Sequence, residues 1–291
     1  MEEIGTLKRS DRMGELKKVL DKIELTRPLN DPVRYARRFR SRADAEIVGL
    51  LVTSVAYGRV DQIMRDAQTL LEILGDRPAQ FVARFTKRQA DKFGGFKHRF
   101  TRSTHMACLV HRLKRALRDY GSLHALFQEG WGGSRDTRIA ISHFVGKLRS
   151  YGCAGFCDDC AAPRRQSVQY LLPEPRNGGA AKRMCLYLRW MVRDTYPDVG
   201  IWNSFPKSAL VIPLDTHVAR IGRFVGLTER RSSDWLTAVE ITDALKQLDP
   251  DDPLRYDYPL SHLGIDGVCR GRYDAARCCS CIVREFCREI A

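Results

Sequence analysis

The sequence predicts an all-α protein, and two observations lead to this class. Apolar residues recur at helical spacing along most of the chain, whereas the alternation of apolar and polar residues typical of β-strands is almost absent. Proline interrupts the pattern at intervals, as at Pro173, Pro197 and Pro213, which suits turns between helices. With 291 residues, the chain is long enough for one large domain or two medium ones.

In the first half of the chain, residues 44–57 and 60–74 are expected to form a pair of helices. The dipeptide Tyr57-Gly58 suits the turn between them. A third helix is expected at residues 98–118, where the apolar residues fall on one stripe. These segments can bury a substantial core.

In the second half, a glycine-rich hairpin leads into a helix expected at residues 178–193. Asp215, or the threonine after it, can cap a helix at 216–225. Two further helices are expected at 235–247 and 253–263.

The charge of the chain indicates a polyanionic partner. It carries 49 Lys and Arg against 35 Asp and Glu, which gives a net charge of +14 and a pI near 9.5. Such an excess can simply keep a protein soluble. Nucleic acid is the better explanation once the motifs below are considered.

The ten cysteines are expected to be reduced. The N-terminus is acidic and no apolar signal segment follows it; the longest apolar run, residues 47–56, is too short to cross a membrane. We therefore expect a cytoplasmic, nucleoid-associated protein with no membrane partner, in which clustered cysteines bind metal.

Four cysteines near the C-terminus have the spacing C-x8-C-x2-C-x5-C. They are Cys269, Cys278, Cys281 and Cys287, and the adjacent Cys279 is left outside the pattern. Thiolates select zinc or iron–sulfur clusters. Because only one pair of the quartet is separated by just two intervening residues, the spacing favours an iron–sulfur cluster over a zinc ribbon, with zinc as the alternative. The same segment contains arginines that suit a polyanion: Arg270, Arg272, Arg277, Arg284 and Arg288.

The hairpin before residue 182 is a candidate phosphate site. Glycines that open a helix leave backbone N–H groups at the positive end of the helix dipole, although two glycines before a helix are usually only a turn. Lys182 follows in the first turn, near Arg176 and Arg183. That position disfavours an ammonium and so favours a nucleophilic amine, unless Lys182 is an ordinary surface lysine.

Asp215 lies between an apolar run and a helix, in the segment LDTHVAR. The simplest role for an aspartate in this position is that of a helix N-cap. The functional alternative is a carboxylate at a cleft, facing a cationic transition state.

Cys153, Cys157 and Cys160 form a second group with the spacing C-x3-C-x2-C. The radical-SAM enzymes use this spacing, but they need an α/β barrel, and this chain lacks the strands for one. A second small metal site remains open, with Cys108, Cys185 or a histidine as its fourth ligand. Three ordinary reduced thiols in a loop are the alternative.

Taken together, these motifs resemble the helix-hairpin-helix base-excision DNA glycosylases of the endonuclease III superfamily, over about residues 40–290. Segment 49–71 is similar to the first barrel helices, and the hairpin with Lys182 to the family's glycine hairpin and catalytic lysine. LDTHVAR is similar to the block that carries the catalytic aspartate, here Asp215. SHLGIDGVC and the cysteine quartet resemble the segment leading into the family's [4Fe–4S] loop. The block RMCLYLRWMVRD resembles a little-characterised bacterial branch of the superfamily.

Three departures from the family pattern stand out. The hairpin, Leu172 to Gly179, is longer than the usual L-P-G-V-G. The stretch between Lys182 and Asp215 is also long, as in the archaeal 8-oxoguanine glycosylases. The family's wedge glutamine corresponds here to Ala56, so Tyr57, Arg59 or a residue of another loop would fill the gap left by an extruded base.

The resemblance implies a two-domain fold. Residues 40–198 would form a six-helix barrel that includes the hairpin, and residues 1–39 would pack with a cluster domain at 199–291. Lys182 and Asp215 would face each other across the cleft between these domains.

The resemblance also implies a DNA glycosylase with AP lyase activity, acting as a monomer on double-stranded DNA that contains a damaged base or an abasic site. Lys182 would be the nucleophile, Asp215 the carboxylate, and the quartet Cys269, Cys278, Cys281 and Cys287 would hold a [4Fe–4S] cluster. The expected DNA contacts are Tyr57, Arg59, Arg176, Asn177, Gly178, Gly179, Ala180, Arg183, His217, Arg270, Arg272 and Arg277. A monofunctional glycosylase and a non-catalytic DNA-binding iron–sulfur protein are the alternatives.

Overall fold

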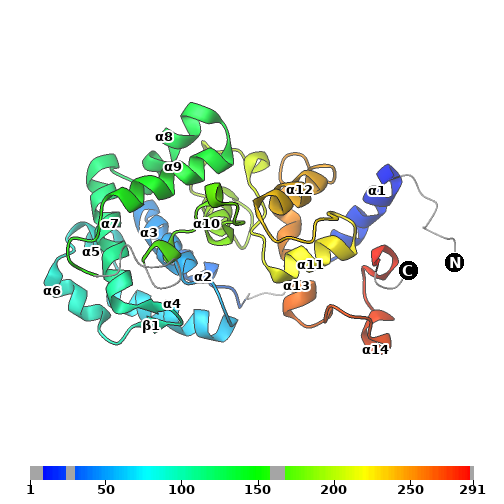
Figure 1. Cartoon of the computed structure of the whole chain (residues 1–291), viewed down its shortest axis with the longest axis horizontal. Coiled ribbons are helices and arrows are strands. Elements are labelled where there is room, and N and C mark those ends of the chain that lie inside the picture. The colour runs from blue at the N-terminus through cyan, green and yellow to red at the C-terminus, as the bar shows by residue number, and fades with distance from the viewer. Residues whose placement is uncertain (1–8, 24–29, 158–167, 289–291) are drawn as a thin grey trace. The chain divides into compact units, whose positions relative to one another are not determined.

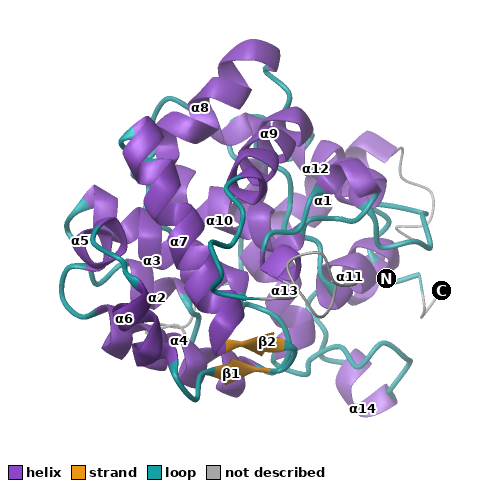
Figure 2. Ribbon diagram, turned by 60° about the vertical axis from the view of Figure 1, so that its left-hand side comes forward, coloured by secondary structure: helices purple, strands orange, loops and turns teal. Residues whose placement is uncertain are grey.

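The protein is helical, as the sequence predicts. The computed structural model describes residues 9–23, 30–157 and 168–288, which are coloured along the chain in Figure 1. Among these residues, the only strands are the two-residue β1 (Lys97–His98) and β2 (Thr101–Arg102), which pair antiparallel (Figure 2). No helix in this part of the chain is long and apolar enough to cross a membrane. The all-α class is therefore confirmed.

The chain divides into two compact units. Unit 1 comprises residues 1–28, 178–182 and 206–291, and unit 2 comprises residues 29–177 and 183–205. The family resemblance implies borders near residues 40 and 198, with the hairpin in the barrel. Here the short segment 178–182 groups with unit 1 instead, so Lys182 and Asp215 belong to the same unit.

Unit 2 contains most of the helices. They are α2 (Val33–Ala36), α3 (Arg42–Ser54), α4 (Val60–Leu74), α5 (Pro78–Ala83), α6 (Lys87–Ala90), α7 (Ser103–Tyr120), α8 (Leu123–Ser134) and α9 (Thr137–Ser150), with all but the first residue of α10 (Lys182–Val192). Short 3-10 turns at Asp91–Phe93, Val168–Leu171 and Pro175–Asn177 connect them. Helix α7 begins five residues later than predicted, because β1 and β2 occupy the start of the expected segment.

The core of unit 2 forms around α3, which is buried along most of its length. Gly49 lets α10 approach closely: a Cβ atom there would lie 2.7 Å from the Met191 methyl group. The buried Glu46 carboxylate accepts hydrogen bonds from the Leu123 backbone N–H (3.0 Å) and the Trp202 indole N–H (2.9 Å). Burial raises the pKa of Glu46, although the two hydrogen bonds act to lower it. This carboxylate therefore joins α3, α8 and the segment after α10 into one core.

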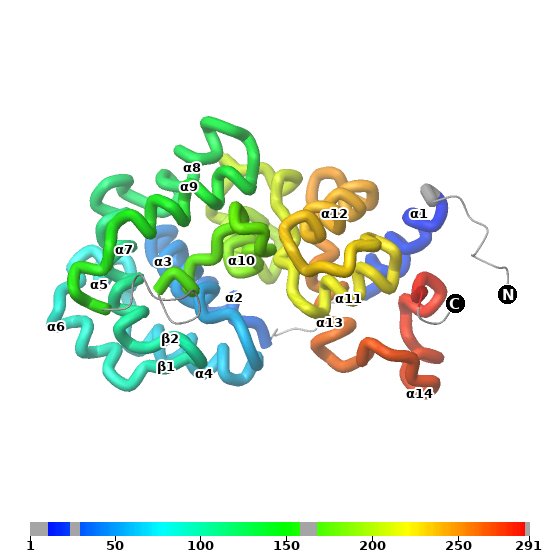
Figure 3. The backbone as a smooth tube through the Cα atoms, in the orientation of Figure 1, coloured from blue at the N-terminus to red at the C-terminus, as the bar shows by residue number. Residues whose placement is uncertain are grey.

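Unit 1 contains α1 (Arg9–Leu20), α11 (Thr216–Phe224), α12 (Trp235–Lys246), α13 (Asp257–Ile265) and α14 (Ala275–Cys278), with 3-10 turns at Lys207–Ala209, Pro253–Tyr256 and Arg284–Phe286. The predicted helix at 253–263 is thus a 3-10 turn followed by α13. The tube in Figure 3 shows α1, from the start of the chain, beside the C-terminal segment. The Arg12 guanidinium donates to the Phe286 carbonyl oxygen at 2.9 Å, which ties these two distant segments together.

Candidate active site and cysteine loop

Lys182 and Asp215 meet at the starts of two helices. Lys182 is the first residue of α10, and Asp215 is the N-cap of α11. The Lys182 Nζ atom lies 3.1 Å from Asp215 Oδ2, and the two side chains are 35% and 18% exposed. The two residues singled out by sequence therefore form a direct, partly buried contact within unit 1.

Both carboxylate oxygens of Asp215 are engaged. Oδ1 accepts from the backbone N–H groups of His217 and Val218, each at 2.9 Å, so the N-cap role expected for Asp215 holds alongside the contact with Lys182. Burial acts to raise the pKa of Asp215, but the Lys182 charge and the Val218 amide outweigh it and lower that pKa. Asp215 is therefore ionised at neutral pH, with one oxygen fixed by the helix and the other directed to the amine.

The position of Lys182 is set by an interaction with α12. Gly179 forms an isolated antiparallel bridge with Asp234, and the Trp235 N–H donates to the Gly178 carbonyl at 3.1 Å. Gly178 has a φ of 81° and Ala181 a φ of 47°, so helical geometry begins only at Lys182. The predicted helix at 178–193 is thus four residues too long at its start, because this segment pairs with α12 instead.

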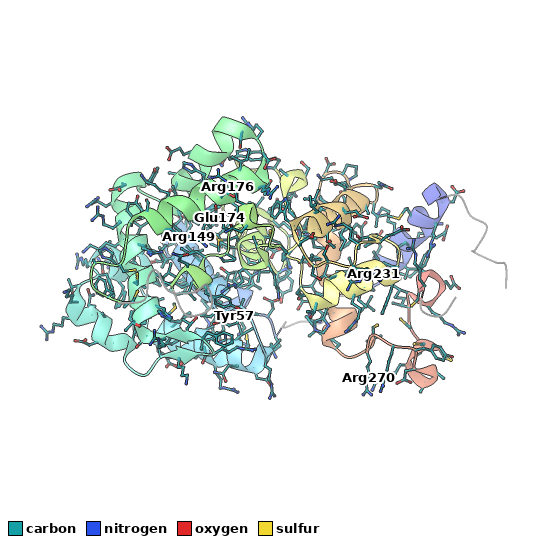
Figure 4. The ribbon with its side chains drawn as sticks, viewed as in Figure 1. Tyr57, Arg149, Glu174, Arg176, Arg231 and Arg270 are labelled. Atoms are coloured by element: carbon teal, nitrogen blue, oxygen red, sulfur yellow. The ribbon has the colours of Figure 1, made fainter. Side chains whose placement is uncertain are left out.

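The other expected hairpin contacts lie at the surface. Arg176 and Asn177 are exposed, as are Gly178 and Gly179, while Ala180 is half-buried. Figure 4 shows Arg176 among the labelled side chains. Arg176 is the hairpin arginine that remains accessible to a phosphate.

Arg183 does not have the exposed position expected of a DNA contact. It is only 7% exposed, and its guanidinium donates to the carbonyl oxygens of Ser54 (2.6 Å) and Tyr170 within unit 2. The guanidinium carbon also lies 4.9 Å from the Tyr57 ring centroid and 4.5 Å from that of Tyr170. Burial lowers the pKa of Arg183 to about 10. Arg183 is thus a core residue, and the phosphate role predicted for it is corrected.

Tyr57 and Arg59, the residues expected to fill the gap left by an extruded base, differ in exposure. Tyr57 is packed edge-on against His98 and Tyr170, and its hydroxyl donates to the His98 carbonyl at 3.0 Å. Arg59 instead points outward, with its side chain 87% exposed and 3.6 Å from Asp61. In unit 2, Arg59 is therefore the more accessible of the two.

His217 is half-buried within unit 1. A Cβ atom added at Gly264 of α13 would lie 2.4 Å from His217 Nδ1, so the glycine makes room for the imidazole. Arg220 Nη2 approaches the same nitrogen at 3.5 Å. This packing favours a role for His217 in joining α11 to α13.

The four C-terminal cysteines line one cavity in unit 1. The C-terminal loop, residues 266–288, wraps around it, and α11 with its C-cap supplies the apolar residues Ile221, Phe224 and Val225. Cys279 is exposed and does not line the cavity. The backbone N–H of Asp274 donates to Cys278 Sγ at 3.4 Å, a contact that suits a sulfur bearing negative charge. Four thiols around one apolar hollow form a donor set that fits a metal centre.

Helix α11 holds both ends of the C-terminal loop. Arg220 donates to the Cys269 carbonyl at 3.0 Å, and the Arg288 N–H donates to the Phe224 carbonyl at 2.9 Å. Gly271, at a φ of 80°, passes so close to Arg220 that a Cβ atom there would lie 2.8 Å from its Cδ. The sequence did not indicate this role for Arg220, although it belongs to the LDTHVAR block. A single helix therefore connects the Lys182–Asp215 pair to the cysteine cavity.

The arginines of the C-terminal loop are not equivalent. Arg270 and Arg272 are exposed at the cavity, and Figure 4 labels Arg270 on the segment leading to α14. Arg277 is half-buried and donates to the Gly267 carbonyl at 2.6 Å, which stabilises the loop itself. Of the three arginines expected to contact DNA in this loop, Arg270 and Arg272 are thus exposed and Arg277 is not.

A second cysteine cluster lies within unit 2. The Sγ atoms of Cys108, Cys153 and Cys157 are all within 4.8 Å of one another, and all three residues are buried. Cys153 is disulfide-bonded in the structure. Cys160, the last cysteine of this sequence motif, lies outside the described residues. The three-cysteine cluster could hold a metal.

Comparisons with known proteins identify a family and no function. No curated protein and no solved structure matches the chain. Residues 31–266 match the family model described as "Protein of unknown function (DUF2400)". The match includes Lys182 and Asp215 and ends before Cys269. Because it covers most of the sequence, the chain belongs to the DUF2400 family.

Proposed function

We propose that this protein is a base-excision DNA glycosylase with AP lyase activity, in which Lys182 is the nucleophile and Asp215 the assisting carboxylate. The observation that carries the proposal is the 3.1 Å contact between Lys182 Nζ and Asp215 Oδ2. An exposed ion pair would say little, since such pairs are common and weak. This pair is partly buried, and two helix starts fix its members.

The chemistry of the pair follows from its geometry. A base inside a duplex must be extruded before an enzyme can reach its sugar. Asp215 Oδ2 accepts a proton from Lys182, and the amine attacks C1′ while the bond from C1′ to the base breaks and its electron pair leaves with the base, which takes the proton from Asp215. The carboxylate, ionised again, stabilises the positive charge on the sugar. Transfer of the remaining amine proton to the ring oxygen opens the sugar and gives a protonated Schiff base; Asp215 then takes the C2′ proton as the 3′ phosphate leaves with the electron pair of its C–O bond.

We assign a [4Fe–4S] cluster to Cys269, Cys278, Cys281 and Cys287. The two cysteine sites differ in spacing: three sulfurs of unit 2 lie within 4.8 Å of one another, and the described cysteines of the C-terminal loop form no such group. A single tetrahedral zinc ion needs its sulfurs about 3.8 Å apart, given Zn–S bonds of about 2.3 Å. Sulfur atoms that are spaced more widely around one cavity favour a metal cluster over a single ion. When bound, the cluster would stabilise the fold of the loop.

DNA binding is proposed for the exposed arginines. The net charge of +14 favours a polyanion, and three candidate arginines are exposed: Arg176 in unit 2, and Arg270 and Arg272 in unit 1. Helix α11 has nine residues, so at about 1.5 Å per residue the cluster cavity along its side lies on the order of 10 Å from Asp215. The cluster would then position DNA-binding arginines without contacting the reacting sugar.

Borohydride trapping on abasic DNA tests the proposal. We expect wild-type protein to form a covalent adduct and Lys182→Ala to form none, whereas Lys246→Ala, which removes an exposed lysine of α12, should trap normally. An adduct that survives Lys182→Ala would exclude Lys182 as the nucleophile. Base release without strand cleavage would indicate a monofunctional glycosylase. Salt-dependent DNA binding without turnover on a lesion panel would indicate a non-catalytic protein.

The cofactor has an independent test. Protein purified without oxygen should contain about four iron and four acid-labile sulfides per chain, as a [4Fe–4S] cluster requires. Cys269→Ser and Cys281→Ser should lose the iron, and Cys279→Ser should keep it. Zinc in place of iron at this loop would overturn the cluster assignment.

A further inference from the structure

We propose that Cys108, Cys153 and Cys157 bind a single zinc ion inside unit 2, separate from the C-terminal loop. Cys108 lies in the middle of α7, and the other two lie in the loop that follows α9. Their three Sγ atoms are mutually within 4.8 Å and all three residues are buried. The site joins a helix to a loop more than forty residues further along the chain.

The spacing of the sulfurs indicates one ion. Tetrahedral ligands at about 2.3 Å from zinc are about 3.8 Å apart, so a small inward shift of the three sulfurs suffices. An iron–sulfur cubane would hold them further apart. Three thiolates with one open position match the three-ligand zinc sites, in which water or another ligand completes the tetrahedron.

A buried arginine supplies the second observation. Arg112 follows Cys108 by one helical turn and is only 2% exposed. Its Nη2 donates to Cys153 Sγ at 3.4 Å and its Nε to the Gly152 carbonyl at 3.1 Å, while its Nη1 makes no hydrogen bond. Within the described residues, Arg112 forms no ion pair with a carboxylate.

A buried guanidinium without an anion is costly. Three thiolates and one Zn²⁺ together carry a charge of −1, which would neutralise Arg112. A set of protonated thiols would leave the charge of Arg112 uncompensated. The charge balance therefore favours a thiolate-bound divalent metal beside this arginine.

The backbone around the cluster is unusually constrained. Gly152, Ala154 and Gly155 all have positive φ angles, of 65°, 48° and 74°. Ala154 is the residue for which this conformation is strained, and such strain persists only where the surroundings fix it. The turns direct both loop cysteines towards Cys108. The centroid of the Phe156 ring lies 5.4 Å from that of Phe85 and 5.2 Å from that of His111. The loop backbone thus brings Cys153 and Cys157 beside Cys108, as a shared metal ligand set requires.

Zinc binding and the Cys153 disulfide exclude each other. The structure records Cys153 in a disulfide, and a disulfide sulfur carries no thiolate charge for a metal. A phosphine reductant breaks the S–S bond with two electrons and two protons, leaving two thiols and a phosphine oxide whose oxygen comes from water. The thiols then release protons as the metal binds. We therefore expect zinc only in the reduced protein.

Metal analysis of the full-length reduced protein tests the site. We expect one equivalent of zinc to be lost from Cys108→Ser and from Cys157→Ser, whatever the C-terminal loop contains. Cys185→Ser is the matched control, because Cys185 is buried in α10 but is not part of the three-cysteine cluster. Cys157→His should retain zinc, since imidazole also binds it.

Chelation gives a readout that needs no variant. Removing zinc from reduced wild-type protein should lower its thermal midpoint, and added zinc should restore it. The chelator should leave the midpoint of Cys157→Ser unchanged. The proposal is overturned if reduced wild-type protein holds no more zinc than Cys157→Ser, or if oxidation of the protein leaves its zinc content unchanged.

Discussion

Asp215 and Asp234 occupy the same local structure with different partners. Each is the N-cap of a helix: Asp215 accepts from two amides of α11, and Asp234 accepts from the Thr237 N–H of α12 at 2.9 Å. Each also contacts a cation, Lys182 at 3.1 Å in the first case and Arg230 at 3.0 Å in the second. Local geometry alone therefore cannot distinguish a catalytic carboxylate from a structural one.

The difference lies in the cation. Arg230 is four residues before Asp234 on the same segment, and a guanidinium does not lose its proton in proteins. Lys182 is distant in sequence and carries an amine that can release its proton. The Asp215 side chain is also the less exposed, at 18% against 32% for Asp234. Of the two pairs, only Asp215 and Lys182 thus combine the less exposed carboxylate with an amine.

The largest effect is expected from exchanging the cation without changing its charge. Lys182→Arg should abolish borohydride trapping, because a guanidinium cannot form a Schiff base, while the charge facing Asp215 remains. Arg230→Lys is the matched change beside Asp234 and should trap at the wild-type level. Trapping by Lys182→Arg would show that the covalent step uses another amine.

A slightly smaller effect is expected from neutralising the two aspartates. Asp215→Asn should lower the single-turnover rate of base release by about 10²–10³-fold, the usual loss when one electrostatic contact to a transition state is removed. Because asparagine caps helices as well as aspartate does, Asp234→Asn should stay within about twofold of wild type. Equal losses in both variants would point to a structural effect and remove the distinction between the two aspartates.

Sequence predicts the caps well and their partners poorly. The all-α class and the helix after Asp215 follow from local periodicity and capping, and the predicted end of α12 lies within one residue of its observed end. The bridge from Gly179 to Asp234, which sets the position of Lys182, joins segments more than fifty residues apart. No local pattern encodes such a contact.

Arg183 shows the same limit from the other side. In sequence it is a basic residue next to Lys182 at a helix start, which suggests a surface contact. In the structure the helix turns it into unit 2, where two backbone carbonyls and two aromatic rings satisfy its charge. The sequence does not indicate the roles of Arg112 and Arg220, because these roles depend on loops that only the fold brings close.

A moderate effect on stability is expected from removing each cap. Asp215→Ala and Asp234→Ala should each lower the free energy of unfolding by about 1 kcal/mol, the usual contribution of an N-cap. Urea denaturation of the two variants measures this, with the asparagine variants as controls that retain the cap. A loss confined to Asp234→Ala would mean that the cap of Asp215 is offset by the cost of burying its charge.

The smallest effect is expected in the response to acid. The pKa of Asp215 is lowered from its ordinary value of 3.8, so its contribution to stability is complete above that value and is lost as pH falls through the lower, folded-state pKa. The amide of Thr237 is the main cause of the lowered pKa of Asp234, so the sign is the same there. Between about pH 5 and pH 2, wild-type protein should therefore lose stability more steeply than either asparagine variant. The pH dependence of urea midpoints measures this, and the two slopes should fall together in the double variant. If the slope is unchanged in Asp215→Asn but reduced in Asp234→Asn, then only Asp234 contributes to the acid sensitivity. Folding would in that case not favour the ionised form of Asp215, despite its contact with Lys182.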